Sequence, residues 1–262
     1  MTNCLNSFNP RPAMSDPWIV PIDRLDVGFA PFRWTFADTR RDGIAAHFQA
    51  RRLATPQLWN GRILLMRGFA IADGTLRGTY FETDFADFLA WRDWDFPDPT
   101  VVNCFPMGAL RASDGAWLMG VMSNGTANPG RIYFAAGTPD RDDLRGDTVD
   151  LLGNVLREIR EETGLTAADL TVAPGWHAVV DGPRIAVMKP VEIPFPAQEA
   201  RTRMLRHLES EAEPELSDIR IVRSAADLDP AMPRFVTAYL THLWASFCGH
   251  RRVGKGGTPA QG

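Results

Sequence analysis

The chain has few cysteines, no long apolar run and no excess of basic residues. Its three cysteines, Cys4, Cys104 and Cys248, are odd in number and widely spaced, which argues against a disulfide framework or a cysteine zinc site. No apolar stretch approaches the roughly 18 residues of a membrane-spanning helix. The net charge of −4 gives no electrostatic footprint for nucleic acid. We therefore expect a globular protein of the reducing cytoplasm, without a membrane or nucleic-acid partner.

The two ends of the chain differ in composition from its middle. The N-terminus lacks a charged start followed by an apolar stretch, so we expect no signal peptide. Residues 1–13 are polar and contain proline, and residues 249–262 are basic and rich in glycine. Both segments are expected to be disordered, because they carry too little apolar surface to form a core.

Residues 14–96 are predicted to form an N-terminal subdomain of hairpin and helices. The turn Asp73-Gly74 joins two runs typical of strands. Pro97-Asp98-Pro99 breaks the following helix and marks the boundary. The predicted elements are a helix over 37–54, strands over 62–72 and 75–82, and a helix over 85–94.

Residues 97–248 are predicted to form the main domain. Apolar runs, separated by turns rich in glycine, alternate here with amphipathic segments. Strands on both sides of a helix favour a mixed sheet between helices. The predicted strands cover 101–111, 116–123, 131–136, 176–180, 184–193 and 219–223, and the predicted helices cover 150–163, 196–211 and 233–247.

The segment 157–165 carries the clearest chemical signal in the sequence. It places Glu158, Glu161 and Glu162 at spacings of three and four on one face of a helix. Such crowding of like charges costs free energy unless a cation lies between them, and Mg²⁺ prefers oxygen ligands. Gly164 is placed to end the helix. The plainer alternative is a solvated surface helix with ordinary Glu/Arg pairs.

The run from Arg157 to Leu165 resembles the second half of the Nudix box. In that pattern Arg-Glu is followed by two residues, then Glu-Glu, one further residue and Gly. The first half is irregular. Gly137 and Asp143 fit its glycine and its first acid, with Asp143 in place of glutamate. Thirteen residues then precede Arg157, where the family has seven, so the box carries a six-residue insertion. Leu144 to Gly153 fill it, with Gly146 as a turn, and its apolar residues predict packing.

The resemblance implies a fold and a reaction. The implied fold is α/β (α+β), a Nudix-type α/β/α sandwich with a mixed sheet. The implied reaction is Mg²⁺-dependent hydrolysis of the pyrophosphate bond in a nucleoside diphosphate linked to another moiety, with Mn²⁺ as a substitute metal. The metal ligands would be Glu158, Glu161, Glu162 and the Ala136 carbonyl. Catalysis would rest on Glu161, Glu162 and Arg157, with Arg157 orienting the glutamates. A homodimer is left open.

The substrate-binding residues and the general base are less clearly marked. Arg131, Asp140 and Trp94 are candidates for substrate contacts, and Asp140 lies where many family members have an additional acid. The segments 59–61 and 83–89 resemble a branch of the family that hydrolyses UDP-sugars. Tyr80, Phe81 and Trp91 fit base stacking or, more simply, core packing. Candidates for the base are Glu209, Glu211, Glu213 and Glu215, although a solvated acidic loop is the simpler interpretation.

Two other functions remain open. The first is a catalytically silent Nudix-fold module that senses a nucleotide. Such modules usually lose box glutamates, and this chain retains all three together with Arg157. The second is a structural or interaction protein with an incidental acidic helix, which the match over Arg157–Leu165 disfavours. The sequence therefore favours an enzyme.

Overall fold

The computed structural model of the chain describes residues 16–252, with side chains through residue 246. The predicted disordered segment 1–13 lies outside the described residues, as do residues 253–262 of the predicted tail. Helix α6 (Arg234–Arg252) continues four residues beyond the predicted boundary at 248. Within the described part, no helix is both long and apolar enough to cross a bilayer.

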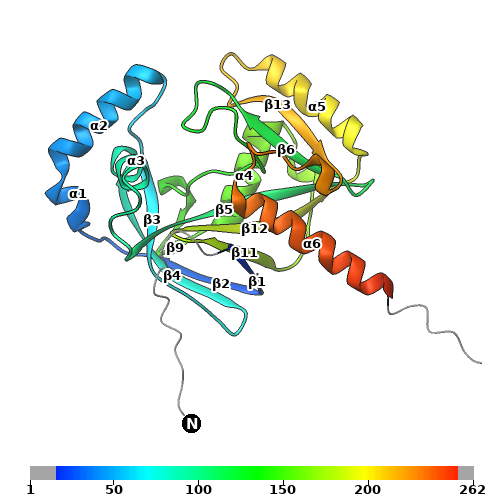
Figure 1. Cartoon of the computed structure of the whole chain (residues 1–262), viewed down its shortest axis with the longest axis horizontal. Coiled ribbons are helices and arrows are strands. Elements are labelled where there is room, and N and C mark those ends of the chain that lie inside the picture. The colour runs from blue at the N-terminus through cyan, green and yellow to red at the C-terminus, as the bar shows by residue number, and fades with distance from the viewer. Residues whose placement is uncertain (1–15, 253–262) are drawn as a thin grey trace, which may run out of the picture.

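A continuous set of paired strands forms the centre of the molecule (Figure 1). Its main path runs in the order β1-β11-β12-β5-β3-β4-β2-β9-β8, and β10, β13, β6 and β7 pair beside it. The strand bounds are β1 Trp18–Ile22, β2 Arg24–Phe29, β3 Arg62–Ala72, β4 Thr75–Asp84, β5 Val101–Ala112, β6 Trp117–Met122, β7 Ile132–Tyr133, β8 Leu144–Arg145, β9 Thr148–Val149, β10 Thr171–Val172, β11 Trp176–Asp181, β12 Arg184–Ile193 and β13 Leu216–Val222.

The sheet is mixed, as predicted. β5 and β12 are parallel neighbours at its centre, with Asn103 opposite Arg184 and Phe105 opposite Ala186. β3 and β4 form the predicted antiparallel hairpin, and so do β11 and β12. Parallel central strands need both faces covered, and helices cover both. The predicted fold class, a mixed sheet between helices, is thus confirmed.

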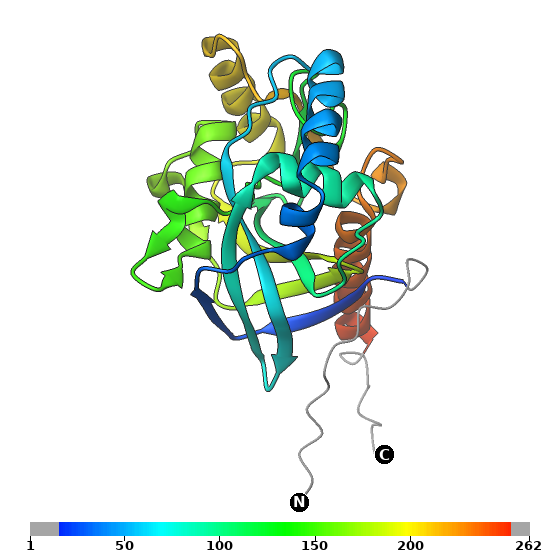
Figure 2. The ribbon, with the colours of Figure 1, turned by 90° about the vertical axis from the view of Figure 1, so that its left-hand side faces the viewer.

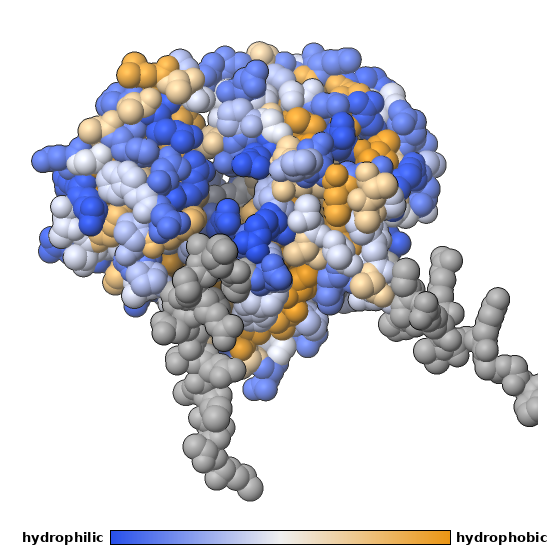
Figure 3. All heavy atoms as spheres, viewed as in Figure 1, coloured by the Kyte–Doolittle hydropathy of each residue, from blue (hydrophilic) through white to orange (hydrophobic). Residues whose placement is uncertain are grey.

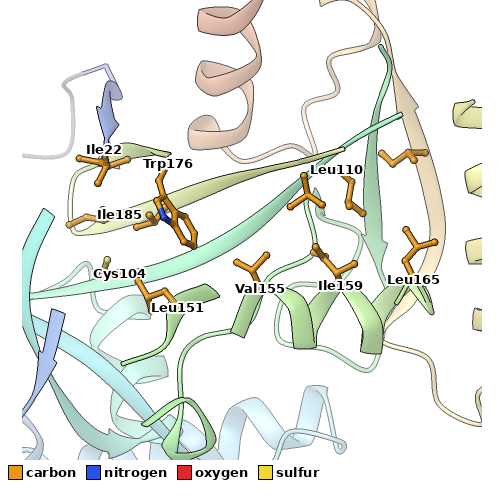
Figure 4. Packing of buried hydrophobic residues seen from close by; sticks show 14 of the residues in the cluster. Ile22, Cys104, Leu110, Leu151, Val155, Ile159, Leu165, Trp176 and Ile185 are labelled. Carbon is orange, nitrogen blue, oxygen red and sulfur yellow. The ribbon is translucent and has the colours of Figure 1, made fainter. Parts of the chain in front are cut away.

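Helices α4 (Leu151–Thr163) and α5 (Ala197–Ser210) cover one face of the sheet. Figure 4 shows Val155 and Ile159 of α4 pointing toward Leu110 on β5. Alternation along β5 explains the contact, because Cys104 and Leu110 face this side while Met107 faces the other. The apolar side of α4 is therefore buried, and its opposite side is free to carry charge.

Two groups of helices share the other face of the sheet. Helix α6 covers β11, β12 and β5 through Val236, Tyr239 and Leu240. Helices α1 (Thr35–Thr39), α2 (Arg41–Ala54) and α3 (Phe85–Asp93) cover β3 and β4 in a separate apolar cluster. Figure 2 shows these three helices and the β3–β4 hairpin on the side that faces the viewer. The two covers are distinct clusters, and the strip of sheet between them lines a cavity.

The predicted division at residues 96 and 97 runs through this sheet. β3 pairs with β5 at Met66 and Val102. β1 pairs with β11 along its whole length, from Trp18 opposite Val180 to Ile22 opposite Trp176. The subdomain boundaries remain a prediction, but the strands on either side of them are joined by backbone hydrogen bonds.

Several element bounds differ from the predicted ones. The helix over 37–54 is two helices, because the chain breaks at Arg40, whose φ of −118° and ψ of 16° are not helical. The strand over 131–136 is only β7, followed by one bridge between Ala135 and Gly108. The insertion forms the short β8–β9 hairpin around Gly146, and Val149 is buried in the core beneath it. The insertion therefore packs, as its apolar residues predicted.

Candidate active site

Helix α4 carries the candidate metal ligands, and local signals fix both of its ends. The Asp150 carboxylate accepts a hydrogen bond from Gly153 N at 2.8 Å and caps the N-terminus. Gly164 ends the helix with φ 71°, a left-handed conformation that glycine adopts without strain. The predicted helix over 150–163 is thereby confirmed to within one residue.

Two of the three helix glutamates are removed from water. The Glu162 residue is 4% exposed and the Glu158 side chain 12%, whereas the Glu161 side chain is 50% exposed. Burial raises the pKa of the Glu158 carboxyl to about 7, against the attraction of Arg157. Burial, followed by the charge of Glu158, raises the pKa of Glu162 well above its ordinary value. Buried carboxylates without a neutralising cation are costly, so this helix face favours binding one.

The Ala136–Gly137 backbone closes over these carboxylates. Ala136 N donates a hydrogen bond to Glu162 Oε1 at 3.2 Å. The Glu158 carboxylate lies so close to Gly137 that a Cβ there would collide with it. Glycine here therefore lets the Glu158 carboxylate approach the backbone, and a larger residue would displace that carboxylate. The loop and the helix therefore meet, with Ala136 beside Glu162.

Arg157 links the box loop to the helix. Its guanidinium lies 2.8 Å from Glu158 Oε1 and 3.4 Å from Glu161 Oε2. It also donates to both oxygens of Asp143, at 3.2 and 3.3 Å. Burial opposes its charge, but Glu158 and Asp143 raise the pKa of Arg157. Arg157 thus contacts carboxylates from both halves of the box, as an orienting residue would.

Asp143 is fixed as firmly as any residue of the site. It is 2% exposed, and its carboxylate also accepts from Asn154 Nδ2 at 2.8 Å and from Asp140 N at 3.0 Å. These donors and Arg157 converge on one buried carboxylate, so Asp143 holds Arg157 in place. Aligning Asp143 with the first acid of the box therefore has a structural reason, despite the insertion that follows.

A cavity of about 400 Å³ opens beside the helix glutamates. We call it the acid pocket. Of the four candidate bases, Glu209 does not line it and the other three do. His207 lies at its edge, where its Nε2 is 2.9 Å from Glu161 O and 3.3 Å from Glu211 Oε1. The acid pocket is lined by Glu158, Glu161, Glu162, Glu211, Ala212, Glu213 and Glu215.

The acid pocket has the donor chemistry of a Mg²⁺ site. All six of its ionisable lining residues are carboxylates, the ligands that hard divalent cations prefer. Among the described residues, no three His, Cys, Asp or Glu side chains are gathered tightly enough to hold a metal ion. Arg157 engages Glu158 and Glu161 in this arrangement. The carboxylates must therefore turn away from Arg157 to share a cation.

A second, larger cavity of about 670 Å³ is lined in part by Ala136 and Gly137. It lies over the strip of sheet between α3 and α6. Figure 3 shows the surface hollowed between the part that carries α1–α3 and the rest of the molecule. We call this cavity the arginine cleft. Its lining includes five arginines and no acid: Arg51, Arg92, Arg131, Arg184 and Arg234, with Phe85, Phe88, Asn103, Phe105, Met107, Asn128, Tyr133, Ala136, Gly137, Thr138 and Phe235 among the others.

The predicted substrate contacts fall in different places. Arg131 lines the arginine cleft. Trp94 lies outside its lining, against Phe36 and His47 of α1 and α2, with ring centroids at 5.9 and 5.7 Å. Asp140 caps the turn at Arg141–Asp143 by accepting from Asp142 N. Only one of the three residues predicted to contact substrate therefore lines this cavity.

The sequence does not reveal most of the cleft. Tyr80, Phe81 and Trp91 are fully buried in the core, which was the simpler of their two interpretations. The aromatic residues that do line the cleft are Phe85, Phe88, Phe105, Tyr133 and Phe235. One usable signal was present, because Asn103 interrupts an otherwise apolar strand. A polar residue in such a strand has to face either a partner or a cavity.

No protein-family model and no curated protein matches the chain. Solved structures similar to it include the Nudix hydrolase RenU from M. smegmatis, at 18% identity over 55% of this chain and 86% of that one, with a TM-score of 0.37. An Ap4A hydrolase from C. elegans has 14% identity over 55% and 98%, with a TM-score of 0.39. The pyrophosphohydrolase BsRppH from Bacillus subtilis has 14% identity over 62% and 87%, with a TM-score of 0.35. At such low identity, function has to be argued from the residues of the site.

Proposed function

We propose that the protein is a metal-dependent Nudix-type pyrophosphohydrolase that cleaves a nucleoside diphosphate linked to another moiety, by attack of water on phosphorus. One observation carries the proposal. Glu162 and Glu158, which line the acid pocket, contact Ala136 and Gly137, which line the arginine cleft. A site for cations thus borders directly on a site for anions.

Glu158, Glu161 and Glu162 would hold Mg²⁺, together with the Ala136 carbonyl. The buried glutamates provide negative charge that has no cation of its own apart from Arg157. When bound, Mg²⁺ supplies positive charge that offsets the negative charge growing on the phosphate oxygens. Mn²⁺ has the same charge and accepts the same oxygen ligands, so we expect it to substitute.

The chain's own residues divide the remaining work. The cleft arginines bind the phosphate oxygens and bring the scissile bond to the Ala136–Gly137 backbone. Arg157, held by Asp143, keeps the glutamates in place. Glu215 is the residue we assign as proton acceptor for the attacking water. It lines the acid pocket, and burial followed by the charges of Glu161 and Glu211 raises its pKa.

UDP-sugars are the substrates that we propose first. The two segments that resemble the UDP-sugar-hydrolysing branch contact each other here. Asn60 Oδ1 accepts from Ala86 N at 2.8 Å, and Gly61 O accepts from Phe85 N at 2.9 Å. Together they hold the N-terminus of α3, which presents Phe85 and Phe88 to the arginine cleft. The resembling residues thus shape a wall of the cleft without entering it.

The test measures phosphate release, coupled to alkaline phosphatase, from UDP-sugars, ADP-ribose, NADH, dinucleoside polyphosphates and coenzyme A. Each substrate is tried with Mg²⁺, Mn²⁺ or EDTA. Glu161→Gln is the informative variant, because this half-exposed side chain can be changed with little effect on folding. We expect a loss of about 10²- to 10³-fold in kcat.

Glu199→Gln is the matched control, since Glu199 is exposed on α5, outside both cavities, and pairs with Arg203. Full activity of Glu161→Gln would contradict the metal-site assignment. A folded protein that binds Mg²⁺ but hydrolyses none of the panel would instead favour the nucleotide-sensing alternative.

A further inference from the structure

Among the described residues, two buried polar atoms on the floor of the arginine cleft have no hydrogen-bond partner. One is Asn103 Oδ1, and the other is Arg184 Nε. Asn103 is only 7% exposed, and both residues line the cleft. An unpaired buried polar group costs free energy, so native proteins rarely leave one without a use.

Strand register places these two residues side by side. Asn103 on β5 is the parallel partner of Arg184 on β12, so both side chains lie on the same face of the sheet. This is the face that α6 covers further along, where Met107 and Met188 are buried beneath it. The uncovered stretch between α6 and α3 is where Asn103 and Arg184 lie.

The surroundings hold the pair without satisfying it. Arg184 Nη2 donates to Asp181 Oδ2 at 3.0 Å, which anchors the far end of the guanidinium and leaves Nε free. Asn103 N donates to Pro183 O at 2.8 Å, which fixes the backbone at that point. One free acceptor and one free donor are therefore preorganised together.

Aromatic rings flank this polar floor. Phe105 follows Asn103 on the same face of β5, and its ring packs edge-to-face against Phe235 of α6 with centroids 5.5 Å apart. Phe88 of α3 lines the opposite wall. A flat ligand that enters between these walls buries its faces against carbon and its edge against the free atoms.

We propose that Asn103 and Arg184 form the subsite for the nucleobase of the substrate. The base would donate a ring or exocyclic N–H to Asn103 Oδ1 and accept from Arg184 Nε through an adjacent carbonyl oxygen or ring nitrogen. The cavity volume of about 670 Å³ suits a ligand of nucleotide size. The ligand's identity rests on the proposed function, but its binding requires neither metal nor hydrolysis.

The test measures binding of UMP, GMP, AMP, CMP and ribose 5-phosphate by calorimetry, in EDTA, to the whole chain. At least one nucleotide should bind about tenfold or more tightly than ribose 5-phosphate, because only the nucleotides carry a base. The ranking of the four nucleotides identifies the base. Equal binding of all five ligands, or of none, overturns the proposal.

Asn103→Leu separates recognition from packing. It replaces the amide by an apolar group of similar size and removes the unpaired acceptor, so the free protein should melt no lower than wild type. Base selectivity should nevertheless fall about tenfold. Asn124→Leu, in the exposed loop after β6, is the control and should change neither.

If Asn103→Leu keeps wild-type selectivity, the subsite is wrong even when the enzyme hydrolyses its substrate. Base-selective binding that Asn103→Leu abolishes, in a protein without activity, would retain the subsite and reject the proposed hydrolysis. The two proposals can therefore fail independently.

Discussion

The acid pocket and the arginine cleft lie next to each other but are lined by side chains of opposite charge. Six glutamates line the first, and five arginines line the second. Glu162 and Glu158 of the pocket contact Ala136 and Gly137 of the cleft, because glycine lets the Glu158 carboxylate approach the backbone. An anionic substrate is attracted by the cleft and repelled by the pocket. On the proposed function, a phosphate group would therefore enter the pocket only with a cation bound there.

Burial sharpens this contrast. The carboxylates that contact Ala136 and Gly137, those of Glu162 and Glu158, have raised pKa values because water is excluded from them. Arg157 supplies one positive charge to the pocket from the side of Asp143. In the arginine cleft, the guanidinium groups of Arg51 and Arg92 each lie 3.0 Å from an oxygen of the Asp93 carboxylate, and Arg184 pairs with Asp181. The cleft arginines are thus held in place yet keep donors for a ligand.

After the loss expected for Glu161→Gln, the largest effect should come from removing the proposed proton acceptor on the pocket side. Glu215→Gln keeps the shape of the side chain and its backbone bond with Ser123 N, but it cannot take a proton. We expect kcat to fall about 10²-fold, with KM changed little. The rise of kcat with pH, which reports deprotonation of the base, should also disappear. Glu213→Gln in the same loop is the control.

A normal pH profile in Glu215→Gln would assign the base to another residue. If Glu213→Gln showed the larger loss, the roles of these two glutamates would be exchanged. Equal small losses in both would mean that the loop contributes only general negative charge to the pocket.

A smaller effect is expected from weakening the cleft side. Arg131 is exposed, lines the cleft and, among the described side chains, has no ion-pair partner. Arg131→Met should raise KM about tenfold and leave kcat nearly unchanged, because it removes binding that substrate and transition state share. The difference from wild type should shrink in 0.5 M salt, since roughly that ionic strength screens charges beyond a few ångströms.

Arg206→Met, an exposed position on α5 outside both cavities, should leave KM unchanged. A fall in kcat rather than a rise in KM for Arg131→Met would move Arg131 from substrate binding to catalysis. The arginine cleft would then contribute to catalysis as well as to substrate binding.

The two cavities also differ in how far the sequence predicts them. The pocket follows from local rules: Glu158 and Glu162 are four residues apart on one helix, and Gly164 ends it. The loop that completes it was also visible, because Gly137 and Asp143 keep their spacing despite the insertion. The hairpins β3–β4 and β11–β12 follow equally from their turns and apolar runs.

The cleft was invisible for a physical reason. Its walls come from α3 and α6, and its floor pairs Asn103 with Arg184, so it exists only through contacts between distant segments. Nothing near Arg184 in the sequence shows that it lies beside Asn103. Trp94 illustrates the same point, because its aromatic character is satisfied by packing against α1 and α2. Long-range pairing, rather than local propensity, decided which aromatics line the cavity.

The smallest effect, and the closest test of the contrast, concerns stability. The folded-state pKa of Glu158 is about 7, above its ordinary value of 4.5. Between these two values the folded protein binds more protons than the unfolded one. The free energy of unfolding therefore falls as pH rises from about 4.5 to 7, and the penalty is complete above pH 7. Glu158→Gln removes this residue's part of the penalty, although it also removes one partner of Arg157.

We therefore expect the metal-free Glu158→Gln variant to melt a few degrees higher than wild type at pH 8 and no higher at pH 5. Added Mg²⁺ should raise the melting temperature of wild type at pH 8 and should raise that of the variant less. Differential scanning fluorimetry in EDTA, with and without excess Mg²⁺, measures both. A variant that is less stable at pH 8 would show that its pairing with Arg157 outweighs burial. The acid pocket would then be a stabilising ion-pair network rather than a site whose buried carboxylates destabilise the fold without a cation.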